Sequence, residues 1–185
     1  MKFVIEHLEP ELYEWCLLEY KHISEIVGKE NLIFTNIKKD QDKLKGFGKI
    51  YKQSIKELNF QKICILDPAA EKTLSAEDKN KFDYLVFGGI LGDYPMKKRT
   101  KAELSDKMNA EKRNIGKKQM STDTAVYVAK EILKGKSLKD FKFKDEIEIK
   151  IDGGESIQLP FRYLIINNKP LLPKGLIEYL KKHPF

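Results

Sequence analysis

The chain has 185 residues but few of those that build disulfide or metal centres, with only two cysteines and three histidines. Cys16 and Cys64 lie far apart, and neither belongs to a CxxC pair or lies beside a group of histidines. This spacing supports neither a disulfide framework nor a zinc site. We expect two buried thiols in a reducing compartment and no bound metal.

Long apolar runs are also missing. The longest uncharged apolar run, Tyr84 to Leu91, is far too short to span a membrane, and Glu6 comes too early for the core of a signal peptide. Hydrophobic residues make up 41% of the chain and charged residues 34%, which is typical of a globular protein. We expect a cytoplasmic protein with one domain, or one domain with an appendage, and no membrane partner.

The net charge of +7 is unevenly spread, because each of two regions has few charges of one sign. Residues 94–118 hold nine Lys or Arg and three acids, a net of +6, whereas residues 1–30 hold three Lys and seven Glu, a net of −4. A basic stretch is typical of surfaces that meet RNA or a ribosome, and an acidic region suits a basic partner. Solvated helix faces carry similar charges, so both interpretations stay open at this point.

Short apolar strands alternate with helical segments in the first two thirds of the chain. Strands are expected at 3–6, 31–35, 62–66 and 84–87, and helices at 10–27, 48–58, 101–113 and 121–133, with a helical turn at 75–81. Nearly continuous apolar strands separated by helices are typical of a parallel sheet covered on both faces. The sequence therefore predicts the α/β class.

The C-terminal part of the chain has a different pattern. Residues 147–151 alternate in polarity, Asp152-Gly153-Gly154 predicts a turn, and residues 156–159 form the returning strand of a hairpin. A further strand is expected at 161–166 and a closing helix at 176–182. We therefore divide the chain into an α/β domain over residues 1–135 and an extension over residues 136–185 that packs on the same domain.

A glycine-rich bend, residues 88–93, directly follows the strand expected at 84–87. Glycines let main-chain atoms approach a ligand closely or adopt a positive φ. The bend, the loop Asp67-Pro68-Ala69 and residues 119–124 are all expected at the carboxyl edge of the sheet, where open α/β sheets bind ligands. The spacing GGxxG differs from the dinucleotide fingerprint GxGxxG, and a complete phosphate-binding loop is absent. These residues alone predict a pocket for an unidentified ligand, with a structural turn as the alternative.

Two segments, Val86 to Asp93 with Pro95, Arg99 and Thr100, and Gln119 to Val126, resemble the SPOUT-class methyltransferases. This family includes the SPOUT protein arginine methyltransferase and relatives described as predicted RNA methyltransferases. The resemblance covers nearly the whole chain, because further similarity lies at Ile5-Glu6-His7, Glu9, Trp15, Glu19, Tyr20, Leu159 to Tyr163, Pro170, Pro173 and Gly175. It implies a mostly parallel sheet flanked by helices with a trefoil knot at about 62–135, followed by a C-terminal hairpin and helix.

The resemblance also implies that the three loops bind S-adenosylmethionine in a bent conformation and release S-adenosylhomocysteine. Main-chain groups of the bend and of residues 119–124 would hold the adenine and ribose, and residues 66–68 would close the third side. The implied cofactor-binding residues are Leu66, Asp67, Pro68, Gly88, Gly89, Ile90, Leu91, Gly92, Gln119, Met120, Ser121, Thr122, Thr124, Ala125 and Val126. Gly89→Val is expected to abolish cofactor binding while leaving the fold mostly intact.

Carboxylates are the natural partners of an arginine that accepts a methyl group, because the guanidinium is protonated in water and must lose a proton. Asp93 ends the bend and Glu6 ends the first strand at the same expected edge, so both are candidate catalytic residues. His7, Glu19 and Arg99 are candidate substrate-binding residues. The structural alternatives are a surface carboxylate for Glu6, a core histidine for His7 and a solvated loop charge for Arg99.

Three functions stay open. The resemblance favours methylation of an arginine in a basic ribosomal or RNA-associated protein, which the acidic region at 1–30 suits. The second is an RNA methyltransferase acting on rRNA or tRNA, whose phosphates the basic stretch at 94–118 would contact. The third is a non-catalytic ribosome-binding module, and fold does not decide among them. A homodimer formed through the knot is also expected to be possible, unless the extension covers that surface.

Overall fold

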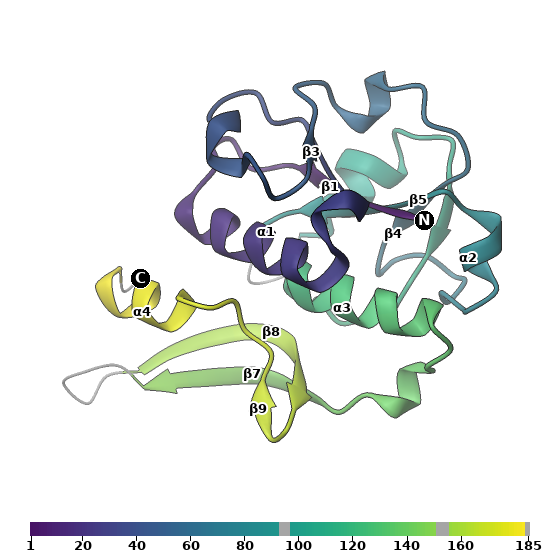
Figure 1. Ribbon diagram of the computed structural model, residues 1–185. Helices are drawn as coiled ribbons and strands as arrows, with labels where there is room; N and C mark the ends of the chain where they lie inside the picture. The colour runs from purple at the N-terminus through teal and green to yellow at the C-terminus, as the bar shows by residue number, and fades with distance from the viewer. Residues whose placement is uncertain (93–96, 151–155, 184–185) are drawn as a thin grey trace.

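A computed structural model describes residues 1–92, 97–150 and 156–183. The expected turn Asp152-Gly153-Gly154 and the candidate catalytic Asp93 lie outside these residues. The first part of the chain forms a six-stranded sheet in the order β3-β2-β1-β5-β4-β6, and every neighbouring pair is parallel (Figure 1). The strands are β1 (Lys2–His7), β2 (Leu32–Thr35), β3 (Lys49–Ile50), β4 (Ile63–Leu66), β5 (Tyr84–Gly89) and β6 (Glu111–Arg113). The α/β class is confirmed.

The central strands are mostly apolar because both faces of the sheet are buried. Phe3 and Ile5 of β1 pack in a core with helices α1 (Glu14–Val27) and α3 (Thr122–Leu133), which lie side by side (Figure 1). Val4, between them, faces the opposite core with Ile55 and Leu104. Successive strand residues point to opposite faces, which explains this division. None of the helices in the described residues is long and apolar enough to cross a membrane.

Two of the expected helices are wrong. Residues 48–58 form β3 and, after a loop, a 3-10 turn at Ile55–Glu57, where the Ser54 and Glu57 side chains form a capping box. Residues 101–113 form a π-helical turn at Lys101–Ser105 and then the strand β6. Both new strands are short, and each adds an outer strand to a sheet whose edge is otherwise open. Tertiary pairing outweighs the local helical pattern in both cases.

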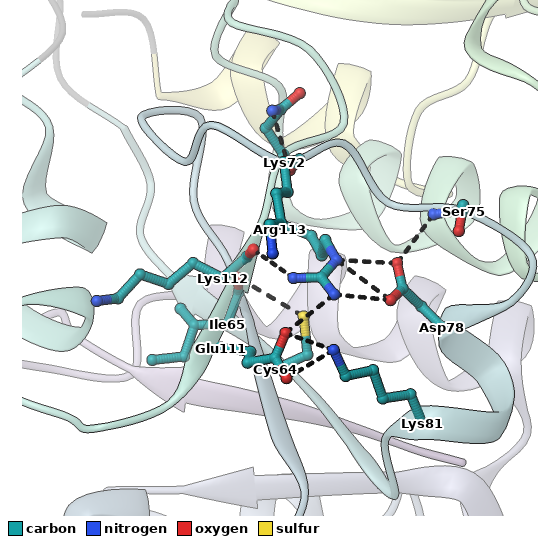
Figure 2. Close-up of polar contacts among 10 residues, drawn as sticks. Cys64, Ile65, Lys72, Ser75, Asp78, Lys81, Glu111, Lys112 and Arg113 are labelled. Atoms are coloured by element: carbon teal, nitrogen blue, oxygen red, sulfur yellow. Dashed lines mark hydrogen bonds and ion pairs between the residues drawn. The ribbon is translucent and has the colours of Figure 1, made fainter.

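A buried ion pair fixes the edge strand β6, as Figure 2 shows. Arg113 donates from Nε and Nη2 to Asp78, with distances of 3.0 Å to Oδ2 and 2.9 Å to Oδ1. Asp78 begins the short helix α2 (Asp78–Lys81) and also accepts the Ser75 N–H at 3.1 Å. Arg113 Nη2 reaches Glu111, which in turn pairs with Lys81. The start of the loop at residues 114–121 is therefore tied to α2.

The C-terminal part forms a second, antiparallel sheet. Strand β7 (Phe143–Lys150) pairs with β8 (Ser156–Ile166), so the expected hairpin is confirmed, and the strand expected at 161–166 is the second half of β8. β9 (Lys169–Pro170) and α4 (Leu176–Lys182) follow. Trp15 of α1 packs among the apolar side chains of this part, with its ring 6.4 Å from that of Tyr179. The boundary between 135 and 136 and the trefoil knot stay predictions.

Both cysteines are buried and free, as expected. Burial raises the pKa of each thiol to about 12, so neither Cys16 nor Cys64 is a thiolate at neutral pH. Cys16 lies in the core on the α1 side of the sheet, and Cys64 lies within β4. Their role is therefore to fill the core as small apolar side chains.

Candidate functional site

Three loops meet at the carboxyl edge of the sheet and enclose a cavity of about 410 Å³, within the usual size range of small-ligand pockets. One loop follows β4, the second follows β5, and the third connects β6 to α3. The described part of the lining is Leu66, Asp67, Pro68, Ala69, Phe87, Gly88, Ile90, Lys97, Lys98, Arg99, Thr100, Ile115, Gly116, Lys117, Lys118, Gln119, Met120, Thr122 and Ala125. The expected convergence of loops is thus present as a cavity.

The structure brings together most of the cofactor-binding residues expected from the sequence. Those that line the cavity are Leu66, Asp67, Pro68, Gly88, Ile90, Gln119, Met120, Thr122 and Ala125. The others lie outside the described lining: Gly89, Leu91, Gly92, Ser121, Thr124 and Val126. Val126 belongs to the core beneath the site, and Ser121 is the N-cap residue of α3, with its hydroxyl 2.9 Å from that of Thr124.

The three glycines of the bend have different roles. Gly88 lines the cavity, whereas Gly89 is buried, and a Cβ added there would lie 2.3 Å from the Tyr20 hydroxyl. Gly92 has a φ of 94°, and a Cβ there would lie 2.5 Å from the Phe161 ring. The expectation that Gly89→Val leaves the fold mostly intact is therefore wrong, because the valine side chain would collide with core atoms.

Glu9, which lies outside the three loops, and Arg99, which lies in the loop after β5, hold the bend in place. Glu9 Oε1 accepts the Leu91 N–H at 3.1 Å and a hydrogen bond from Arg99 Nη1 at 2.8 Å. Arg99 also donates to the Leu8 carbonyl at 2.6 Å and to Glu103 at 2.8 Å. The guanidinium of Arg99 therefore already has three protein acceptors at the cavity. Glu9 was not among the candidate site residues. Its similarity to the SPOUT-class methyltransferases was the feature of the sequence that could have identified it.

Glu6 is fully buried and does not line the cavity. Its carboxylate accepts hydrogen bonds from the hydroxyls of Thr35 at 2.5 Å and Ser54 at 2.6 Å, and from the Ile55 N–H at 2.9 Å. These contacts tie β1 to β2 and to the 3-10 turn at Ile55–Glu57. The surface alternative for Glu6 is wrong, and the position gives no support to a role in proton removal.

His7 is also buried, which matches the alternative of a core histidine. Its Nδ1 lies 2.8 Å from the Tyr20 hydroxyl, and burial lowers the pKa of the imidazole, so the ring is neutral at pH 7. The nearby Glu11 carbonyl and Glu9 carboxylate only partly offset that effect. The ring is not part of the cavity lining, so it braces β1 against α1 behind the bend.

Glu19 forms a buried cluster between α1 and α3. It accepts the Trp15 indole N–H at 3.0 Å, and it faces Asp123, whose carboxylate is also bonded to His22 at 2.7 Å. Burial and the charge of Asp123 raise the pKa of Glu19 well above its usual value, although hydrogen bonds from Thr122 act in the opposite direction. Because Thr122 lines the cavity, this cluster supports the cavity wall from behind.

Four exposed lysines line the cavity: Lys97 and Lys98 after β5, and Lys117 and Lys118 before α3. Lys118 pairs with Asp145 at 2.5 Å, and Lys117 donates to the Ala70 carbonyl at 2.7 Å. Among the described lining residues, Asp67 is the one carboxylate. All four lysines belong to the basic stretch at 94–118, but nothing in the sequence placed that stretch at the pocket. The positive potential favours ligands that carry a carboxylate or phosphate.

The cavity fits an adenosyl cofactor. Apolar walls suit a flat base, and the buried Asp67, which accepts the Ala69 N–H at 2.8 Å, lies among them as a polar anchor. The apolar lining residues are Leu66, Phe87, Ile90, Ile115, Met120 and Ala125. These features define an α/β protein that binds a nucleoside-type cofactor at the carboxyl edge of a parallel sheet.

Comparison with known proteins is more specific. A family model described as "Protein arginine N-methyltransferase SFM1-like" matches residues 2–184, so the chain belongs to the SFM1-like family. The protein arginine N-methyltransferase SFM1 of Saccharomyces cerevisiae (strain ATCC 204508 / S288c) is 37% identical over 203 residues, which cover 98% of this chain and 95% of that protein.

The fold agrees with solved structures of the yeast protein. The crystal structure of the yeast arginine methyltransferase SFM1 complexed with SAM has a TM-score of 0.88 at 37% identity, and covers 98% of this chain and 90% of that chain. The complex with SAH has a TM-score of 0.87 at 36% identity, with coverages of 97% and 94%. The resemblance that the sequence suggested is thus confirmed.

Proposed function

We propose that this protein transfers the methyl group of S-adenosylmethionine to an arginine side chain of another protein. The observation that carries the proposal is the three-loop cavity at the carboxyl edge of the sheet, in a chain that belongs to the family described as "Protein arginine N-methyltransferase SFM1-like". When bound, the cofactor supplies a methyl group on a sulfonium. A guanidinium nitrogen forms the new N–C bond as the S–C bond breaks, the nitrogen loses a proton, and S-adenosylhomocysteine is the second product.

The residues of the cavity contribute mainly by positioning. Gly88, Ile90, Gln119 and Thr122 would hold the nucleoside, and the apolar walls would exclude water from the reacting atoms. The lysines of the lining suit the carboxylate of the cofactor. Holding donor and acceptor in line supplies most of the acceleration in such a transfer, because the entropic cost of bringing them together is met on binding.

The acceptor nitrogen needs a group that orients the guanidinium and helps remove its proton. We assign Asp93 to this role, because it is the last residue of the bend in the sequence and a carboxylate suits the guanidinium fork. Glu6 is not included, since all its described contacts are internal to the sheet and the adjoining turn. Arg99 is assigned to the support of the bend rather than to the substrate.

The substrate that we propose is a basic ribosomal or RNA-associated protein, met in the cytoplasm. Exposed Glu11 and Glu14 lie in the sequence just after Glu9, which contacts the bend, and they suit a positively charged segment. The second candidate is methylation of RNA, whose phosphates the exposed lysines would contact.

Methyl-labelled S-adenosylmethionine tests the proposal. The protein is incubated with purified ribosomal proteins in one reaction and with deproteinised RNA in another, and the labelled residue is identified by mass spectrometry. We expect label on arginine in the first reaction only. Label on RNA alone would replace the proposal by the second candidate, and label in neither reaction would favour a binding module without catalysis.

A matched pair of variants shows whether the cavity is the site. Ala125→Leu places a larger side chain in the cavity and should lower the cofactor affinity at least tenfold, because it occupies the volume a ligand needs. Ala102→Leu makes the same change at an exposed position outside the cavity and should leave the affinity unchanged. Equal affinities of both variants in calorimetry would place the cofactor elsewhere.

A further inference from the structure

The chain leaves the sheet for the bend where the backbone ladder between β1 and β5 ends. The last rung is the bond from the Leu8 N–H to the Gly89 carbonyl, at 3.0 Å. In a continuing parallel ladder the Leu91 N–H would next bond to the Leu8 carbonyl. The Leu91 N–H instead donates to the Glu9 carboxylate, and the Leu8 carbonyl instead accepts from Arg99. Two side chains thus replace the missing rung.

We propose that Glu9 is a positioning residue for methyl transfer, because it fixes the point at which the cofactor-binding bend departs from the sheet. This inference rests on the proposed function. Glu9 lies outside the cavity lining of the described residues, so its effect passes through Leu91 and Arg99.

The geometry makes this carboxylate hard to replace. One oxygen, Oε1, accepts from both Leu91 and Arg99, and the Glu9 side chain is only 12% exposed, so water screens the pair weakly. Both bonds involve a charged partner, and such bonds are stronger than neutral ones. In the sequence, Leu91 precedes and Arg99 follows Asp93, so Glu9 contacts the chain on both sides of the proposed catalytic residue.

Glu9 and Glu103 both accept from Arg99, but only Glu9 also accepts from the bend among the described residues. Glu103 accepts from Arg99 Nε at 2.8 Å and is four residues away on the same segment, but it has no contact with the bend among the described residues. Removing the charge of Glu103 therefore weakens the hold on Arg99 and leaves the Leu91 contact intact. This difference supplies a matched control.

The test compares the full-length parent protein with Glu9→Ala, Glu9→Gln and Glu103→Gln. S-adenosylmethionine affinity is measured by calorimetry, KM and kcat by methylation of the acceptor, and folding by thermal denaturation without cofactor. Glu9→Ala is expected to weaken cofactor binding roughly tenfold or more, the size of one lost charge-assisted hydrogen bond. Glu9→Gln keeps an oxygen for Leu91 but loses the charge that pairs with Arg99, so its affinity should lie between those of the parent and Glu9→Ala, whereas Glu103→Gln should change the affinity less than about twofold.

Each outcome bears on the proposal. A Glu9→Ala variant that binds the cofactor as the parent does would overturn it, and so would equal losses in Glu9→Ala and Glu103→Gln, which would assign the effect to Arg99 alone. If Glu9→Gln has the melting temperature of the parent and Glu9→Ala has a lower one, the loss of cofactor affinity in Glu9→Ala is structural and the proposal fails. Failure of the parent itself to bind S-adenosylmethionine would instead refute the proposed function on which the inference rests.

Discussion

At the scale of single residues, environment changed the meaning of several side chains that composition alone treats alike. Glu6, Glu9 and Glu19 are the same residue type in one acidic region of the sequence. Glu6 ties the sheet to a turn, Glu9 holds the bend, and Glu19 is buried beside the carboxyl group of Asp123. Gly89 likewise belongs to a motif that suggests ligand contact, but a glycine is needed there because a Cβ would collide with the hydroxyl of Tyr20. A residue's contacts, not its place in a motif, decide such roles.

The raised pKa of Glu19 predicts how stability depends on pH. Above the ordinary pKa of a glutamate, the folded protein holds a proton on Glu19 that the unfolded chain does not, so unfolding releases a proton. The stability from this group is complete below the ordinary pKa and is lost as pH rises toward the raised value. We expect Glu19→Gln to reduce the fall in unfolding free energy between about pH 5 and pH 8.

Urea denaturation across that pH range measures the effect. Glu14→Gln makes the same change at an exposed position of α1 and should leave the pH dependence of the parent unaltered. If the unfolding free energy of Glu19→Gln changes with pH as steeply as that of the parent, Glu19 is ionised in the folded state.

At the scale of elements, short strands and turns were the least predictable part of the fold. The two-residue β3 and the three-residue β6 carry too few residues to produce an alternating pattern, and both lie in stretches that look helical. Long apolar strands such as β5, and α3 with its apolar stripe and Ser121 at the N-cap, were predictable because many residues agree. Register and pairing partners supplied what the local pattern lacked.

The ion pair that fastens β6 should contribute measurably to stability. Asp78→Ala leaves Arg113, whose side chain is 7% exposed, without its main partner, and should lower the unfolding free energy by about 3 kcal/mol. Lys81→Ala removes an exposed pair with Glu111 and should cost less than about 1 kcal/mol. Urea denaturation of the two variants measures both values, and similar losses would mean that burial of the Arg113 pair adds little.

At the scale of the whole molecule, the C-terminal sheet reaches back to the cofactor site. The Phe161 ring packs against Gly92, and the Arg162 N–H donates to the Gln119 carbonyl at 2.9 Å. The strand β8 therefore touches two of the three loops that enclose the cavity. An extension that looks like an appendage in the sequence thus supports the site.

This contact predicts an effect at a distance from the cavity. Phe161→Ala removes the ring beside Gly92 and should weaken S-adenosylmethionine binding severalfold, because the bend gains conformational freedom that binding must remove. Ile177→Ala, at a 39% exposed position of α4, should leave affinity unchanged. Calorimetry on both variants decides the point, and an undiminished affinity of Phe161→Ala would make the extension irrelevant to the cofactor.

The sequence by itself determined the α/β class, the main strands, the C-terminal hairpin and the three loops of the site, because apolar periodicity and glycine spacing are local properties. It also carried the resemblance that led to the family. Only the tertiary structure decided that Gly89 serves packing, that Glu6 is internal, that four lysines line the cavity and that Glu9 replaces a rung of the sheet. These facts depend on side chains from distant parts of the chain meeting in space, and no local pattern encodes such meetings.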